Sequence, residues 1–321
     1  MSIISLYNQV KNAKLDSKYK AIIIPGANDV FLASDETGRP CLFLKSNENN
    51  TWPSLHTERI SLCLNKEYLL LFQDGTRAQG KYNALLCLSD MPEDIDTFLT
   101  LLEAFIIHSK NVEIRTEEII SFFYSLARLF AIKPDENIKS RRQGLWGELL
   151  MMRSIKGYAF WAPFWHIESN RLFDFSMQGK RIEVKTTTKP NRIHSVSHSQ
   201  VYSLGNDDIL IASILLKEDD SGVSLRTLIS ECREALKRTQ YYFKIENAIR
   251  HANMQNPSEE GPKFNINDAE RSLRWYNSEN VPRFESEEPE GVSGTHYMID
   301  LTNSIAVEHA WLSDWLNQWH T

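Results

Sequence analysis

The sequence of 321 residues has few cysteines and lacks a long apolar run. No apolar stretch reaches the roughly 18 residues of a membrane-spanning helix, and residues 1–6 lack the basic segment that opens a secretory signal. The cysteines lie far apart without C-x-x-C spacing, which argues against a disulfide framework and a zinc site. They are Cys41, Cys63, Cys87 and Cys232. We therefore expect a cytoplasmic protein with buried, reduced thiols and no membrane contact.

An excess of positive charge is also absent. The chain has 36 Lys and Arg against 42 Asp and Glu, a net charge of −6, which argues against a uniformly basic nucleic-acid binder. Residues 138–192 differ, because they contain eleven Lys or Arg and only four acidic residues. This segment predicts a surface that holds a polyanion near a cation site. Uneven surface charge is the alternative, and this feature alone does not decide between them.

The order of the predicted elements indicates an α/β protein with three regions. Residues 1–110 are predicted as a β-rich N-terminal domain, in which 30–33 and 41–44 form a hairpin around 35–40. Residues 111–222 are predicted as an α/β core with a mixed sheet, and 223–321 as a mixed C-terminal region. Further short strands are predicted at 59–64, 68–72 and 84–88, and two helices at 93–109 and 116–131.

In the C-terminal region, residues 224–238 have the apolar spacing of an amphipathic helix, and 297–301 favour a strand. Most of the late Pro, Gly and Glu lie in 256–294, which we therefore expect to form solvated loops. Trp311, Trp315 and Trp319 recur every four residues, a spacing more typical of packing than of a ligand site.

The most informative segment predicts a β-hairpin at 171–187. Apolar and polar residues alternate on both sides of the turn residues 178–180. A two-residue turn at 178–179 places Asp174 opposite Glu183, whereas a turn at 179–180 places it opposite Lys185. In either register these three polar side chains share one face. The apolar residues of the hairpin point into the core: Phe173, Phe175, Ile182 and Val184.

This pattern predicts a metal site. Adjacent carboxylates repel each other and stay ionised only when a cation lies between them. Mg²⁺ suits Asp174 and Glu183 because it takes oxygen ligands, keeps several waters and accepts phosphate oxygens. Lys185 can hold the water that attacks phosphorus, and Glu148 stands beside the apolar stripe of a helix at 144–152, where it can face the hairpin. The set is typical of metal-assisted phosphodiester hydrolysis.

The same residues resemble the PD-(D/E)XK nuclease superfamily, and most closely the bacterial "PD-(D/E)XK motif proteins" found among restriction and phage-defence genes. The similar segments are 144–149, 173–175, 182–187, 192–194 and 199–201, with weaker similarity at 276–284 and 296–301. Phe173 stands where the superfamily motif has proline, a change that the superfamily tolerates. The resemblance implies a restriction-endonuclease-like fold, a mixed sheet flanked by helices with the site on a hairpin.

The resemblance also implies roles for single residues. Asp174 and Glu183 would bind Mg²⁺, or alternatively Mn²⁺, with Glu148 aiding, and Lys185 would position the nucleophilic water. Gln200 resembles a glutamine that follows the core strand in many superfamily nucleases.

The residues predicted to contact DNA are Arg141 and Arg142, near a helix N-terminus, and Arg192 and His194. A solvated basic turn is the alternative for the first pair, and an ordinary polar loop for the second. His194 is not favoured as part of a transition-metal site, because no third soft ligand is evident. Trp161 and Trp165 favour core packing over stacking on bases.

The leading hypothesis is a Mg²⁺-dependent DNA endonuclease of a bacterial restriction or phage-defence system. It would work with protein partners from the same operon or as a homo-oligomer. A non-cleaving nucleic-acid-binding or scaffolding subunit is the alternative. An RNA-processing nuclease also stays open, because the metal chemistry does not depend on the sugar.

Overall fold

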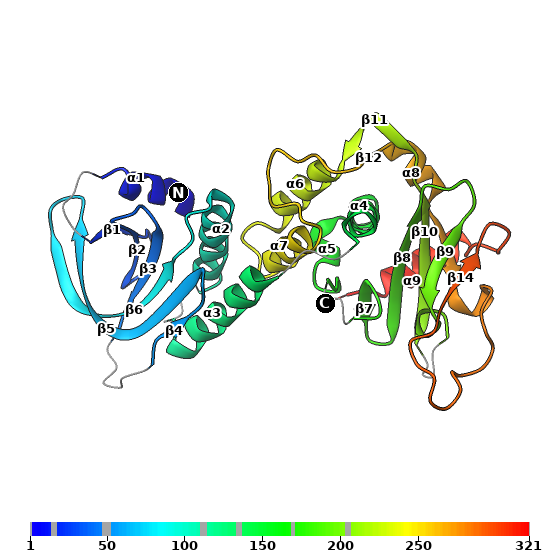
Figure 1. Cartoon of the computed structure of the whole chain (residues 1–321), viewed down its shortest axis with the longest axis horizontal. Helices are drawn as coiled ribbons and strands as arrows, with labels where there is room; N and C mark the ends of the chain where they lie inside the picture. The colour runs from blue at the N-terminus through cyan, green and yellow to red at the C-terminus, as the bar shows by residue number, and fades with distance from the viewer. Residues whose placement is uncertain are drawn as a thin grey trace. The chain divides into compact units, whose positions relative to one another are not determined.

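The computed structural model describes residues 2–13, 18–46, 53–109, 114–132, 137–167, 171–202 and 207–320. The chain forms two compact units, Met1–Lys133 with Lys237–Glu246, and Pro134–Leu236 with Asn247–Thr321 (Figure 1). The segment 223–321, predicted as a region of its own, thus contributes to both units. No helix in the described ranges is both long and apolar enough to cross a membrane.

The first unit contains a closed β-barrel. Its sheet has the order β1-β2-β3-β6-β5-β4, and β1 also pairs in parallel with β5, which closes the barrel (Figure 1). The strands are β1 (Tyr19–Ile23), β2 (Val30–Asp35), β3 (Pro40–Lys45), β4 (Leu55–His56), β5 (Ile60–Phe72) and β6 (Arg77–Cys87). The structure confirms the predicted β-rich character and the hairpin, which is β2–β3.

The strands predicted at 59–64 and 68–72 are one strand, β5. Its register shifts between Cys63 and Lys66, where Asn65 takes a positive φ of 51°. The Asn83 side chain accepts a hydrogen bond from the Asn65 amide at 2.8 Å and so stabilises this bulge. The polar residues at 65–67 look like a turn in the sequence, but the strand continues through them.

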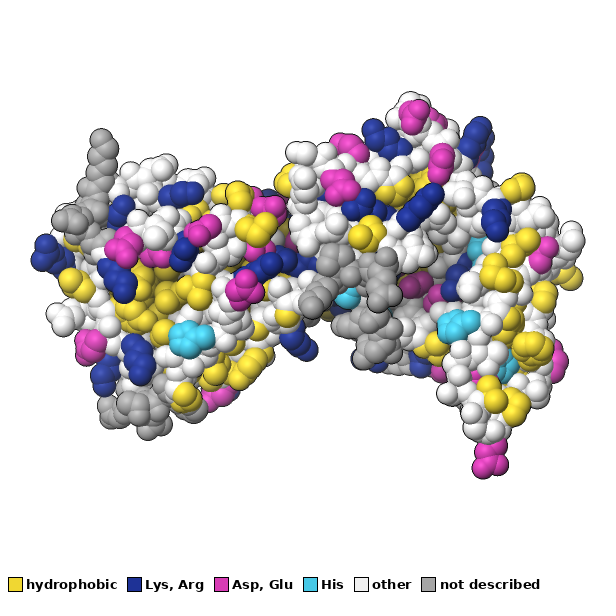
Figure 2. All heavy atoms as spheres, in the orientation of Figure 1, with side chains coloured by type: hydrophobic (Ala, Val, Ile, Leu, Met, Phe, Trp, Pro, Cys, Tyr) yellow, Lys and Arg dark blue, Asp and Glu magenta, His cyan; other side chains and the backbone are white. Residues whose placement is uncertain are grey.

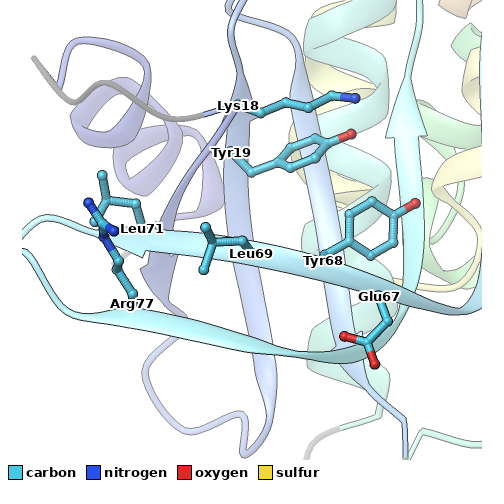
Figure 3. A pocket seen from close by; sticks show the side chains of 7 residues that line it. All are labelled: Lys18, Tyr19, Glu67, Tyr68, Leu69, Leu71 and Arg77. Atoms are coloured by element: carbon cyan, nitrogen blue, oxygen red, sulfur yellow. The ribbon is translucent and has the colours of Figure 1, made fainter.

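The helices of the first unit are α1 (Ile3–Lys11), α2 (Pro92–His108) and α3 (Thr116–Ala131). The last two confirm the helices predicted at 93–109 and 116–131. The barrel wall also holds a pocket of about 480 Å³, in which Tyr19 of β1 faces Tyr68 of β5 (Figure 3). None of the predicted site residues lines this pocket.

The second unit is built on a four-stranded mixed sheet of order β13-β10-β8-β7. Its strands are β7 (Phe175–Met177), β8 (Lys180–Thr187), β10 (Asp208–Leu215) and β13 (Arg274–Asn277). β8 and β10 are parallel, and β7 and β13 run antiparallel to them at the two edges. The sheet confirms the predicted α/β class with a mixed central sheet flanked by helices.

The two faces of this sheet carry different layers. Helix α4 (Ile138–Ser154) packs against β8 on one face (Figure 1). On the other face, β9 (Ile193–Ser197) and β14 (His296–Asp300) form a two-stranded sheet, and its apolar side chains share a core with the central strands. Because alternate residues of β8 point to opposite faces, the strand presents Val184 and Thr186 to α4 and Glu183 to the β9–β14 side.

The remaining elements complete the second unit, apart from the start of α7, which belongs to the first. They are α5 (Tyr158–Trp161), η1 (His198–Gln200), β11 (Glu218–Ser224), α6 (Leu225–Leu236), α7 (Tyr242–His251), β12 (Lys263–Phe264), α8 (Ile266–Ser272), η2 (Ser278–Asn280) and α9 (His309–Asn317). The predicted helix at 224–238 is α6, and the strand at 297–301 is β14. Trp319 packs against Trp161 with ring centroids 5.1 Å apart, and Trp315 is also buried, which confirms packing for these two, whereas Trp311 is exposed.

The expectation of solvated loops at 256–294 is wrong for part of that segment. It contains β12, α8 and β13, and β13 forms one edge of the central sheet with Trp275 and Tyr276 buried. The strand is only four residues long and lies among charged residues. Its two aromatic residues gain their burial from pairing with distant β10, which local composition does not reveal.

Two glycines of α4 provide a test of its packing on the sheet. A Cβ on Gly147 would lie 2.2 Å from Thr186 Cγ2, whereas a Cβ on Gly144 would approach nothing closer than 4.0 Å. We expect Gly147→Ala to force α4 away from β8 and to lower the free energy of unfolding by about 1–3 kcal/mol. Gly144→Ala should raise it by up to about 1 kcal/mol, because alanine favours the helix. Urea unfolding of both variants measures the difference, and equal stability would contradict this packing.

Candidate functional site

The hairpin β7–β8 adopts the first of the two predicted registers. Met177 pairs with Lys180 and Phe175 with Ile182, across a turn at Gln178 and Gly179. Both turn residues have positive φ, 41° and 84°, which is the backbone of a type I′ turn. The predicted core residues Phe173, Phe175, Ile182 and Val184 are all buried. Continuing this register by one residue places Asp174 opposite Glu183.

The short strand β7 pairs only with the beginning of β8, and side chains serve the edge of β8 beyond it. The amide of Val184 donates to Asp174 Oδ2 at 2.7 Å, and Gln143 Nε2 of α4 donates to the carbonyl oxygen of Thr186 at 3.2 Å. These side chains form the hydrogen bonds with the β8 backbone that a neighbouring strand would otherwise form. They also bring Asp174 and the start of α4 to the same edge.

A cavity of about 490 Å³ opens at this edge. The predicted residues that line it are Arg141, Glu148, Asp174, Lys185, His194 and Gln200. In Figure 2 acidic, basic and histidine side chains lie close together in a hollow of the second unit. Six predicted residues from α4, β8, β9, η1 and the segment before β7 thus meet around one cavity. Glu183 is not among its lining residues, but its carboxylate lies 2.9 Å from the ammonium of Lys185.

The carboxylates of Asp174 and Glu183 are costly to ionise in this place. Burial raises the pKa of Asp174 well above its usual value, and the negative charges of Glu183 and Glu148 raise it further. Burial also raises the pKa of Glu183, although the neighbouring Lys185 opposes that rise. A cation near Asp174 would relieve this repulsion.

Lys185 is held in position by two neighbours. Its ammonium donates to Glu183 at 2.9 Å and to Gln200 Oε1 at 3.2 Å. Gln200 in turn donates from Nε2 to the carbonyl oxygen of Leu172 at 3.0 Å. Gln200 therefore connects the lysine of β8 to the segment that ends in Asp174, which fixes the ammonium at the cavity wall.

Glu148 is buried, with 3% of its surface exposed, and both of its carboxylate oxygens have protein partners. Arg141 Nη1 donates to Oε1 at 3.0 Å, and the indole Nε1 of Trp165 donates to Oε2 at 2.7 Å. Trp165 itself is fully buried, so the predicted core packing is confirmed. The sequence pattern did not predict the hydrogen bond from Trp165 to Glu148.

The donor set suits a hard divalent cation. Among the described residues, no three His, Cys, Asp or Glu side chains form a ready-made metal cluster. Mg²⁺ needs only one or two carboxylates when waters and phosphate complete its shell. Asp174 Oδ2 is bonded to the Val184 amide, while Oδ1 accepts no hydrogen bond from any residue of the described ranges. Asp174, with Glu183 beside it, can therefore provide oxygen ligands at the cavity.

Arg142 and Arg192 do not line the cavity. The guanidinium of Arg142 donates to the carbonyl oxygens of Ala252 and Asn253. Buried Arg192 donates to the carbonyl and hydroxyl oxygens of Ser213 and to the carbonyl of Ser272. Both side chains thus tie distant segments of the unit together. Their contacts with DNA stay predictions, and these internal partners would compete with phosphate for them.

Sequence reasoning missed some of the lining residues. Gln143 bonds the edge of β8, and His296 of β14 reaches the cavity from a strand more than a hundred residues further along the chain. Gln143 lies one residue from the predicted arginine pair, and five residues before Glu148. This position near other site residues was the only sign in the sequence that Gln143 belongs to the site, because a glutamine on a helix is usually a surface residue.

His194 is neutral in the folded protein. It is 3% exposed, and its Nε2 lies 2.8 Å from the hydroxyl of Ser213, which also accepts a hydrogen bond from Arg192. Burial, together with the positive charges of Lys185 and Arg192, lowers the pKa of His194 from 6.5 to about 4.

This pKa shift predicts a pH dependence of stability. The unfolded chain binds a proton at His194 below pH 6.5, whereas the folded protein resists it down to about pH 4. Stability from this group is therefore complete above pH 6.5 and is lost as the pH falls through that window. We expect wild type to lose on the order of 2 kcal/mol more than His194→Gln between about pH 7 and about pH 5. Urea unfolding in EDTA measures this; parallel pH profiles would refute a buried neutral histidine.

Comparison with known proteins agrees with the fold. Residues 3–302 match the family described as "Putative PD-(D/E)XK family member, (DUF4420)". No curated protein and no solved structure matches the chain. The match covers nearly the whole sequence and includes both units. The chain belongs to this PD-(D/E)XK family, whose description indicates a nuclease fold.

Proposed function

We propose that this protein is a Mg²⁺-dependent nuclease that hydrolyses phosphodiester bonds of DNA. The observation that carries the proposal is the cavity at the edge of β8, where Asp174, Lys185, Glu148 and Gln200 meet. Two neighbouring carboxylates that repel each other, a partly exposed Asp174 at the cavity and a buried Glu183 beside it, destabilise a fold and are typical of a functional site. Membership in a PD-(D/E)XK family supports the same chemistry.

In this proposal Asp174 and Glu183 would hold the metal, with Glu148 as an additional carboxylate. When bound, Mg²⁺ or Mn²⁺ polarises the scissile phosphate and makes a water easier to deprotonate. The water oxygen then forms a bond to phosphorus, and the bond from phosphorus to the leaving sugar oxygen breaks. The proton of the water passes to solvent, and the leaving oxygen takes up a proton.

Lys185 would hold the attacking water and stabilise the charge that develops on the phosphate. Its ammonium is suited to this role because Glu183 and Gln200 fix it at the cavity wall before substrate arrives. A positive group that is already in place costs no rearrangement when the charge develops. Gln200 would act as a positioning residue, since it contacts Lys185 and the carbonyl of Leu172.

The setting is part of the proposal as well. We propose that the nuclease serves a bacterial restriction or phage-defence system in the cytoplasm, together with protein partners encoded beside it. The β-barrel of the first unit would supply contacts with DNA or with such a partner.

One observation favours a non-cleaving nucleic-acid-binding or scaffolding subunit as second candidate. Glu148 is neutralised by Arg141, and Glu183 by Lys185, so the protein's own cations balance two of the three carboxylates. A subunit that has lost cleavage could keep its fold through these ion pairs. Cleavage with the natural partners present decides between the two candidates.

Lys185→Ala tests the catalytic proposal. We expect the rate of Mg²⁺-dependent DNA cleavage to fall on the order of a hundredfold or more. DNA affinity measured in Ca²⁺ should stay near that of wild type, because one phosphate contact among several changes the salt dependence by only about one charge. The measurements are single-turnover cleavage and equilibrium binding across salt concentrations.

Lys189→Ala is the matched control, since Lys189 is exposed just beyond β8 and does not line the cavity. It should cleave like wild type. A parental rate for Lys185→Ala, or cleavage that survives EDTA, would contradict the proposed mechanism. If wild type binds DNA but never cuts with its partners present, the second candidate replaces the first.

A further inference from the structure

The ion pair between Arg141 and Glu148 occupies the position where the proposed reaction needs both groups for other purposes. Arg141 Nη1 lies 3.0 Å from Glu148 Oε1, and both residues line the cavity. While they are paired, the carboxylate is less available to a metal and the guanidinium less available to a phosphate. The pair therefore has to separate before the site can hold both ligands.

Arg141 is the more exposed member of the pair. Glu148 is held on its other side by Trp165, whose indole is fully buried and donates to Oε2 at 2.7 Å. The side chain of Arg141, by contrast, is 19% exposed and extends along the cavity from the first turns of α4. A guanidinium also exchanges one oxyanion for another readily, because carboxylate and phosphate both match its planar fork of donors.

The charges at the site favour such an exchange. Glu148 is one of the carboxylates whose negative charge raises the pKa of Asp174 and of Glu183, so a positive charge beside it lowers the repulsion in the metal-free protein. A divalent cation near Asp174 would take over that task and would repel the guanidinium. A nucleic-acid phosphate at the cavity would then offer Arg141 a new partner.

We propose that Arg141 stands in for the missing positive charge beside Glu148, and that it transfers to substrate phosphate when the metal binds. This inference rests on the proposed nuclease function and adds a regulatory property to it. Metal and DNA bind cooperatively: phosphate draws Arg141 away from Glu148 and strengthens metal binding, and by reciprocity the metal strengthens DNA binding to the same extent. The protein alone then holds its metal weakly.

Calorimetric titration of the full chain with Ca²⁺, with and without a DNA duplex, tests this exchange without cleavage. For wild type, we expect DNA to tighten Ca²⁺ binding by about tenfold. Arg141→Ala should bind Ca²⁺ at least about fivefold more tightly than wild type without DNA, and should keep less than about a twofold effect of DNA. Arg141→Lys keeps a positive charge but loses the planar fork of donors. It should also bind Ca²⁺ more tightly than wild type without DNA and show a smaller effect of DNA, but both changes should be smaller than in Arg141→Ala.

Lys217→Ala is the control for charge alone, because Lys217 lies exposed between β10 and β11, outside the basic segment 138–192, and does not line the cavity. It should behave like wild type in both titrations. If Arg141→Ala fails to fold, Arg141→Lys carries the test. The inference is overturned if wild type binds Ca²⁺ and DNA but the arginine variants match it. If wild type binds neither ligand, the proposed nuclease function fails with it.

Discussion

The close approach of two carboxylates, a partly exposed Asp174 and a buried Glu183, is the constraint on which the candidate site depends. Both carboxyl groups have raised pKa values, chiefly because they have lost contact with water. The fold compensates locally. Lys185 pairs with Glu183, the Val184 amide donates to Asp174, and Arg141 pairs with Glu148. Lys185 and Arg141 balance the charges of Glu183 and Glu148, whereas the Val184 amide carries no net charge and leaves that of Asp174 unbalanced.

The backbone creates the place for this cluster. Strand β7 ends early, so the edge of β8 from Val184 onward is bonded by side chains instead of a neighbouring strand. Helix α4 can approach that edge because Gly147 leaves room for Thr186. The short strand leaves the edge of β8 open to these side chains, and the glycine lets α4 pack close to it.

The sequence predicted the parts that depend on local order. Alternation around residues 178–180 located the hairpin and offered the correct register, and Glu148 followed from its place beside an apolar helical stripe. It did not predict long-range partners. The continuity of β5 through Asn65, the pairing of β13 with β10 and the bond from Trp165 to Glu148 depend on residues far away in the chain. Nor did positive charge alone indicate that Arg142 and Arg192 bond the protein's own backbone.

The central claim is that Asp174 and Glu183 lie close together to receive a divalent cation. The most direct test is the thermal unfolding midpoint of wild type and Asp174→Asn, measured in EDTA and across Mg²⁺ concentrations. Asparagine keeps an acceptor for the Val184 amide and removes the charge, so the variant should unfold at a higher temperature than wild type in EDTA. Mg²⁺ should then stabilise wild type, by about 2.7 kcal/mol at a hundred times its dissociation constant, and leave the variant unchanged. A wild-type midpoint that does not respond to Mg²⁺, together with a destabilised variant, would contradict the account.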